Sequence, residues 1–158
     1  MPQDQNLYFT AATGDDLHVA TTKGSLSIPL GAARNIGIGS HKLYIEAIVK
    51  VALTTGGKTQ EIDLIAADDA ALTVNVVTIK ASILSFAALA PIGNRQIAHI
   101  PEAQLSAASG AFLKESAFLG IVSQSASGDP GAGSYVALLT LEPGLTTKYA
   151  TTSLVDYP

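Results

Sequence analysis

The chain has 158 residues, of which 47% are hydrophobic, 6% aromatic and 14% charged, and its formal net charge is −4. This length suits one domain with its own core, and high hydrophobicity with low charge is the opposite of a disordered composition. Nucleic-acid binding by counterion release requires clustered Lys and Arg, and the 9 basic residues form no cluster. Because Cys is absent, disulfides and thiolate metal sites are excluded.

Hydrophobic residues alternate with a period of two along most of the chain, which predicts β-strands. The first expected strands are a short one at 7–11 and another at 26–30. The clearest runs from 43 to 53, where aliphatic residues occupy every second position on one face. The other face carries Ile48 and Ala52 beside Tyr44, so we expect this face to be covered too, which favours a homotrimer.

Glycine-rich stretches predict two hairpins. Gly56-Gly57 separates the 43–53 strand from an alternating run at 59–67, and adjacent glycines tolerate the positive φ of a tight turn. Expected strands at 116–125 and 134–142 flank a second Gly- and Pro-rich stretch, which we interpret as a flexible hairpin tip. Two further strands are expected at 73–80 and 95–100.

Short helical turns are expected at only two places. Ser85 is a candidate N-cap for 86–89, and Pro101 suits the first position of a turn through 101–108. Many short strands separated by turn signals predict an all-β fold, an antiparallel β-sandwich with the jelly roll as first choice. We expect one sandwich domain over 1–144 and an extended C-terminal arm over 145–158.

Residue patterns typical of catalysis are not apparent. The histidines are isolated from one another and have no metal-ligand spacing: His18, His41 and His99. The acidic pairs Asp15-Asp16 and Asp68-Asp69 lack the calcium-loop pattern, and we interpret them as solvated loop charge. Gly-x-Ser-x-Gly is also absent. We therefore expect no enzymatic activity, no cofactor and no metal, and the lack of a long apolar span predicts no membrane contact.

One segment resembles a known family. Ile28-Pro29-Leu30-Gly31-Ala32-Ala33-Arg34-Asn35-Ile36-Gly37-Ile38-Gly39, followed by Leu43-Tyr44-Ile45, is similar to the capsid cement (head decoration) proteins of short-tailed bacteriophages of the Bordetella-phage type. In that family a strand ending in Asp-Leu leads into an Ala-Arg-Asp-Ile-Gly-Val-Gly-like turn. Here Pro29 replaces the common Asp and Asn35 the usual Asp of the turn. The similarity continues, in order rather than identity, over 7–142.

The resemblance implies a jelly-roll-like domain that is made in the host bacterial cytoplasm and assembles as a homotrimer on the outer capsid surface of the virion. There it would bind the major capsid protein and bridge neighbouring copies of it, without catalysis or cofactor and without contact to nucleic acid or membrane. We expect the interface to include six residues: Arg34, Asn35, Ile48, Tyr149, Leu154 and Tyr157. We expect the 145–158 arm to dock on a sister subunit or on the capsid protein and to add a strand to an open sheet edge there; the alternative is a disordered tail.

Two other classes remain as alternatives. A carbohydrate-binding or adhesin-type β-sandwich module of a virion usually presents aromatic platforms for sugar stacking, but this chain lacks Trp. Its tyrosines are scattered along the sequence: Tyr8, Tyr44, Tyr135, Tyr149 and Tyr157. A β-barrel enzyme such as a cupin needs clustered His and Glu ligands on facing strands, which the isolated histidines do not provide.

Overall fold

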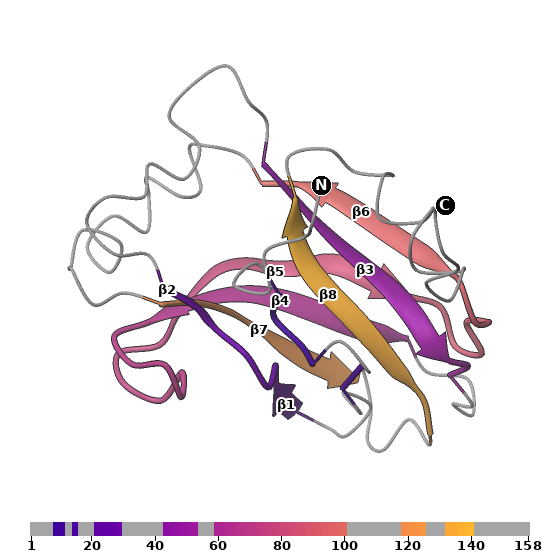
Figure 1. Cartoon of the computed structure of the whole chain (residues 1–158), viewed down its shortest axis with the longest axis horizontal. Helices are drawn as coiled ribbons and strands as arrows, with labels where there is room; N and C mark the ends of the chain where they lie inside the picture. The colour runs from indigo at the N-terminus through magenta and orange to yellow at the C-terminus, as the bar shows by residue number, and fades with distance from the viewer. Residues whose placement is uncertain are drawn as a thin grey trace, which may run out of the picture.

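The structure is a computed structural model, which describes residues 8–11, 14–15, 21–29, 43–53, 59–100, 118–125 and 132–140. These residues form an antiparallel β-sandwich of two sheets, and they include no helix (Figure 1). The prediction of an all-β antiparallel sandwich is therefore confirmed. The jelly-roll connectivity stays a prediction.

The three-stranded sheet has the order β6-β3-β8, and the five-stranded sheet has the order β1-β7-β4-β5 with β2 also paired to β7. In chain order the strands are β1 (Thr21–Lys23), β2 (Ile28–Pro29), β3 (Tyr44–Val51), β4 (Gln60–Ala67), β5 (Val77–Phe86), β6 (Arg95–His99), β7 (Phe118–Ser125) and β8 (Ser134–Thr140). The N-terminal segment lies beside β8, where Tyr8 bridges Leu138 and Asp15 bridges Tyr135.

The hydrophobic core lies between the two sheets. Alternation places Ile45 and Val49 of β3 on the same buried face, and they belong to one cluster with Ile62 of β4. The rings of Phe86 on β5 and Tyr135 on β8 lie 5.4 Å apart at an angle of 50°, so they join the two sheets directly. Each buried side chain of this size contributes about 1.5–3 kcal/mol, which makes this interior the main source of stability.

Both predicted hairpins are wrong, although their strands are present. β3 pairs with β6 on one edge and β8 on the other, and β4 lies in the opposite sheet between β7 and β5. Likewise β7 and β8 belong to different sheets. The apolar face of an alternating strand can be buried whether the next strand of the chain lies in the same sheet or in the sheet across the core. Alternation alone therefore does not determine which strand it pairs with. The hairpin that does form joins β4 and β5 through the 68–76 turn.

Strand boundaries differ most at β5. The prediction began this strand at residue 73, but β5 runs from Val77 to Phe86 because residues 68–76 form a closed turn. Ser85 pairs with Glu61 inside β5 and caps no helix, so the helical turn predicted at 86–89 is wrong. The turn predicted at 101–108 lies outside the described residues. Within residues 8–11, the described part of the expected 7–11 strand, the structure has the single bridge at Tyr8.

Candidate functional site

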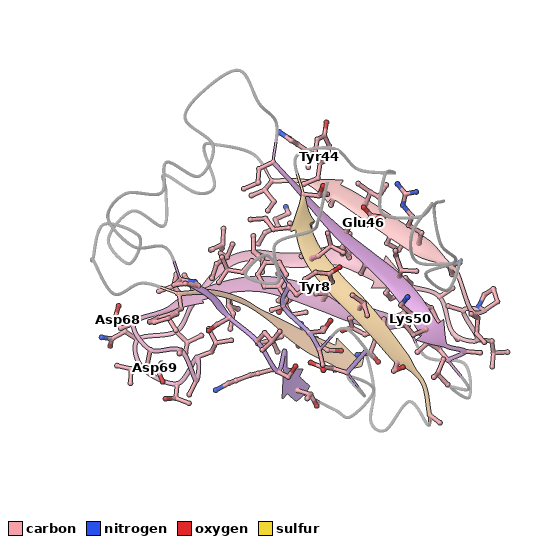
Figure 2. The ribbon with its side chains drawn as sticks, in the orientation of Figure 1. Tyr8, Tyr44, Glu46, Lys50, Asp68 and Asp69 are labelled. Carbon is pink, nitrogen blue, oxygen red and sulfur yellow. The ribbon has the colours of Figure 1, made fainter. Side chains whose placement is uncertain are left out.

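The richest set of chemical groups lies on the outer face of the three-stranded sheet. We use this name for Tyr44, Glu46, Ile48 and Lys50 of β3 and their neighbours across the sheet, because the residues between them belong to the core. In register, Glu46 lies between Ile97 of β6 and Leu138 of β8, and Tyr8 continues this row as the partner of Leu138: Ile97, Glu46, Leu138, Tyr8. Figure 2 shows Tyr8, Tyr44, Glu46 and Lys50 along β3 and β8.

A buried ion pair occupies the centre of this face. Arg95 Nε lies 2.7 Å from Glu46 Oε1, and the side chain of Glu46 is fully buried while that of Arg95 is 22% exposed. The two atoms are at ion-pair distance without the alignment of a hydrogen bond. A carboxylate in this position is tolerated only with a compensating charge, because isolated burial of an ion costs several kcal/mol. The pair therefore serves the structure of the sheet.

The aromatic side chains of the outer face are Tyr8, Tyr44 and His99. Burial, together with the nearby negative charge of Glu46, raises the pKa of Tyr8 above its ordinary value. Tyr44 and His99 are register partners, and their rings meet edge to face with centroids 5.5 Å apart. The contact between Tyr44 and His99 is a packing contact.

The apolar part of the outer face is covered, as the sequence predicted. Ile48, Val136 and Leu138 are each only 4% exposed in a single copy of the chain. Because this burial needs no second copy, it gives no support to a homotrimer. Ile48, the one predicted interface residue among those described, is accordingly not accessible on the surface of one chain. The other five lie outside the described residues: Arg34, Asn35, Tyr149, Leu154 and Tyr157.

A second polar cluster lies inside the sandwich. The Nε2 group of Gln60 on β4 donates to Ser123 Oγ on β7, and the hydroxyl of Tyr135 on β8 lies beside the same serine. Burial raises the pKa of Tyr135 well above its ordinary value, an effect that its interaction with Ser123 partly offsets. The cluster links the two sheets through polar groups. The sequence contains a signal for this cluster. Gln60 lies two residues before Ile62, so both side chains point to the core-facing side of β4.

Acidic side chains also shape the turns. Asp69 accepts hydrogen bonds from Thr73 N and Thr73 Oγ1, both at 2.7 Å, and from Val74 N at 2.8 Å. The Thr73 hydroxyl, the largest contributor, and the Val74 amide lower the pKa of Asp69. Asp68 accepts from Asn75 Nδ2 at 2.7 Å, so both carboxylates of this pair hold the 68–76 turn in addition to carrying surface charge.

Asp15 has the same kind of role near the N-terminus. It accepts from Ser25 N at 2.7 Å, from Ser25 Oγ at 2.8 Å and from Ala11 N at 3.1 Å. These bonds join the segment beside β8 to the loop between β1 and β2. The sequence interpretation of Asp15 as solvated charge missed this contact, because Ser25 is not its near neighbour in the chain.

A bulge in β5 uses two more carboxylates. Ser82 has φ +47°, in the left-handed region, and the β4–β5 register shifts around it. Its N–H donates to Asp63 Oδ1 at 2.7 Å and its hydroxyl to Glu61 Oε2 at 2.8 Å. Bulges of this kind bend an edge strand and interrupt its pairing potential, so these acids are again structural.

Neither a metal-binding group of side chains nor a membrane-spanning helix occurs in the described part of the chain. No group of three His, Cys, Asp or Glu side chains within it could hold a metal ion. Nor do the described ranges include a helix long and apolar enough to cross a membrane. In comparisons with known proteins, no family model, curated protein or solved structure matches the chain. The fold and contacts thus define an antiparallel β-sandwich whose placed polar groups mainly support its own architecture.

Proposed function

We propose that the chain is a structural virion protein, a capsid cement protein that binds the outside of a bacteriophage capsid and stabilises the head by bridging major capsid proteins. The observation that carries the proposal is a difference between polar and aliphatic side chains in where they make their contacts. Glu46, Arg95, Asp69 and Gln60 are engaged in internal contacts, whereas large aliphatic side chains stand exposed. The most exposed of these are Val51, Leu89 and Ile92.

This distribution fits a protein that works by surface contact. Exposed aliphatic groups on a rigid sandwich contribute binding energy when they are buried against another protein. The resemblance of 28–39 to cement proteins points to the same role, with a jelly-roll topology and a homotrimer as its further implications. Of that segment, Ile28 and Pro29 form β2, and the remainder lies outside the described residues.

Stabilisation of the head follows from mass action. A ligand that binds the assembled shell but not its separated subunits stabilises the assembly by RT ln(1 + [L]/Kd) at each site. Many occupied sites on one shell multiply this contribution. Enzymatic turnover and a cofactor play no part in this mechanism.

Co-sedimentation tests the proposal. Purified chain is mixed with intact phage heads or with dissociated major capsid protein, and each mixture is separated on a density gradient. We expect the chain to sediment with intact heads only, and the decorated heads to withstand a higher temperature than undecorated ones. Equal recovery of the chain with and without heads would rule out the cement function.

The carbohydrate-binding alternative has less support from the described residues. Tyr135 is buried, Tyr8 is half-buried, and Tyr44 meets His99 edge to face. These tyrosines therefore form no flat exposed platform for stacking against a sugar. A glycan array separates the two functions, because a cement protein gives no specific glycan signal.

A further inference from the structure

The N-terminal segment closes one side of the sandwich by bonding to both sheets. We call residues 8–11 and 14–15 the N-terminal latch. Phe9 N donates to Ala137 O of β8 at 2.9 Å, and Phe9 O accepts from Leu26 N of the β1–β2 loop at 3.1 Å. The latch therefore joins the edge of the three-stranded sheet to a loop of the five-stranded sheet. Figure 2 shows Tyr8, the first latch residue, beside β8.

The site beneath the latch has a specific chemistry. Phe9 and Thr10 are fully buried, and Phe9 belongs to the core cluster. Thr10 Oγ1 accepts from Ala137 N at 3.0 Å in a buried hydrogen bond. Without the latch, the N–H and C=O of Ala137 and the N–H of Leu26 lose these partners, and buried backbone groups need partners. The site thus suits an extended peptide with an aromatic residue followed by a hydroxyl residue.

Gly24 makes room for the backbone of such a peptide. A Cβ atom built at position 24 would overlap Phe9 O and would lie 2.9 Å from Ile121 Cγ1. Gly24 N donates to Ile121 O of β7 at 3.0 Å, which fixes the glycine against the five-stranded sheet. A glycine at this point allows the close approach of another backbone, here that of the latch.

Asp15 fixes one end of the latch. Its carboxylate accepts from Ala11 N at 3.1 Å, and from Ser25 N and Ser25 Oγ in the β1–β2 loop at 2.7 and 2.8 Å. The backbone of Asp15 also pairs with Tyr135 of β8. One carboxylate therefore holds the latch to the loop, and hydrogen bonds to an ionised group are the stronger ones.

The latch is held by fewer contacts than the central strands of the sheets. Two isolated bridges, Tyr8 with Leu138 and Asp15 with Tyr135, join it to β8, whereas β3 and β4 each pair with a strand on both sides. Phe9 is the one latch residue in the core cluster. Segments with few buried apolar groups open at a lower free energy than the core, and they open as units.

We propose that the N-terminal latch opens as a unit while the two sheets stay folded, and that the opened site binds an extended peptide with an aromatic residue followed by Thr or Ser. In the closed chain the latch itself occupies the site and thereby inhibits it. The apparent affinity for a peptide is then reduced in proportion to the fraction of chains that are open. This inference goes beyond the proposed function and does not depend on binding to a capsid.

A labelled peptide tests the site. A fluorescein-labelled peptide of residues 7–15 is titrated into the full wild-type chain and into the Asp15→Asn variant, and binding is followed by fluorescence anisotropy. We expect the variant to bind about tenfold more tightly or better, because it loosens the latch and leaves the site beneath unchanged. A peptide that carries Phe9→Ala and Thr10→Val should not bind. Failure of Asp15→Asn to bind the natural peptide, or equal binding of the altered peptide, overturns the proposal.

Asp63→Asn is the matched control. The Asp63 carboxylate also accepts from a backbone N–H and a side chain, Ser82 N at 2.7 Å and Gln124 Nε2 at 2.9 Å, but it lies outside the latch. This variant should bind the peptide no better than the wild type. Affinity raised equally in both Asn variants would mean general loosening of the fold, and would overturn the role of the latch.

A disulfide lock separates opening from any other effect of the substitution. Because Phe9 N donates to Ala137 O, Tyr8 and Leu138 form a non-hydrogen-bonded pair, with Cα atoms about 4.5 Å apart, which a disulfide can span. The natural chain has no Cys. Tyr8→Cys with Leu138→Cys is added to Asp15→Asn and checked by circular dichroism. The reduced form should bind the peptide and the oxidised form should not, and binding by the oxidised form overturns the proposal.

Hydrogen exchange on the wild-type chain supplies a readout without substitutions. The amides of Phe9, Leu26 and Ala137 should share one protection factor, lower than that of the β4 amides. Asp15→Asn should lower this shared protection about tenfold and leave β4 unchanged. If the three amides exchange only through global unfolding, the latch does not open separately and the proposal is wrong.

Discussion

Leu72 packs directly on Gly120. A Cβ atom built at position 120 would lie 2.3 Å from Leu72 Cδ1, so the turn residue occupies the space that any larger residue on β7 would need. Leu72 is 2% exposed and forms a small cluster with Ile65 and Ala67 on the outer side of the five-stranded sheet. The 68–76 turn is thereby fastened to the sheet by its apolar side chain as well as by Asp69.

Gly120→Ala should destabilise the protein by about 1–3 kcal/mol, the usual cost of overpacking. The added methyl group must displace Leu72 and loosen the turn. Urea unfolding followed by circular dichroism measures the effect. In a Leu72→Ala background the same change should cost clearly less, because the obstructing side chain is gone. Equal costs in the two backgrounds would contradict the contact.

Arg95→Met should destabilise the protein by about 3–5 kcal/mol, because it leaves the buried carboxylate of Glu46 without its counter-charge. The double variant Glu46→Leu with Arg95→Met removes both charges and should recover most of the lost stability. Guanidinium unfolding curves of the wild type and the variants measure this. A double variant no more stable than Arg95→Met would contradict a structural ion pair.

Asp69 should make stability depend on acid pH. Its pKa in the folded chain is lowered, so its contribution is present above the ordinary Asp pKa of about 3.9 and is lost as the pH falls through the lower folded value. Asp69→Asn should flatten the dependence of Tm on pH in this acidic window. Thermal unfolding across a pH series measures it, and parallel curves for wild type and variant would contradict the prediction.

Tyr135 should make the chain sensitive to alkali. Its pKa is raised in the folded state, so the folded chain is fully stable below the ordinary Tyr pKa of about 10 and loses stability as the pH rises toward the folded value. Tyr135→Phe should reduce this loss, with a small cost at neutral pH from the lost hydroxyl contact to Ser123. Ultraviolet titration of tyrosinate should show one late-ionising group fewer in the variant. An unchanged titration would contradict the burial of this hydroxyl.

Strand positions could be predicted from the sequence because alternation reports which face of a segment is buried. The strands predicted around β3, β4, β6, β7 and β8 are confirmed. Strand partners could not be predicted, since a glycine pair such as Gly56-Gly57 permits a hairpin without requiring one. The start of β5 was missed because the side chain of Asp69 closes a turn across residues that resemble a strand.

Most polar contacts of the candidate site could not be predicted from the sequence. By alternation, Glu46 lies on the face of β3 that the sequence predicts to be partly exposed to solvent. Its partner Arg95 comes from a strand far along the chain. Gln60 and Ser123 carry a usable signal, because they are polar residues at core-facing positions of their strands. Which strands become neighbours in a sheet depends on the tertiary fold, which a local pattern does not encode.

The position of β3 between β6 and β8 has a consequence for biosynthesis. During translation β3 leaves the ribosome early, but one of its edges has no partner until β8 has been made. Until then an apolar strand with free hydrogen-bonding groups is available to other nascent chains. Premature termination between His99 and Ser134 therefore produces fragments that are prone to aggregate, and yield in expression should depend on the synthesis of Ser134–Thr140.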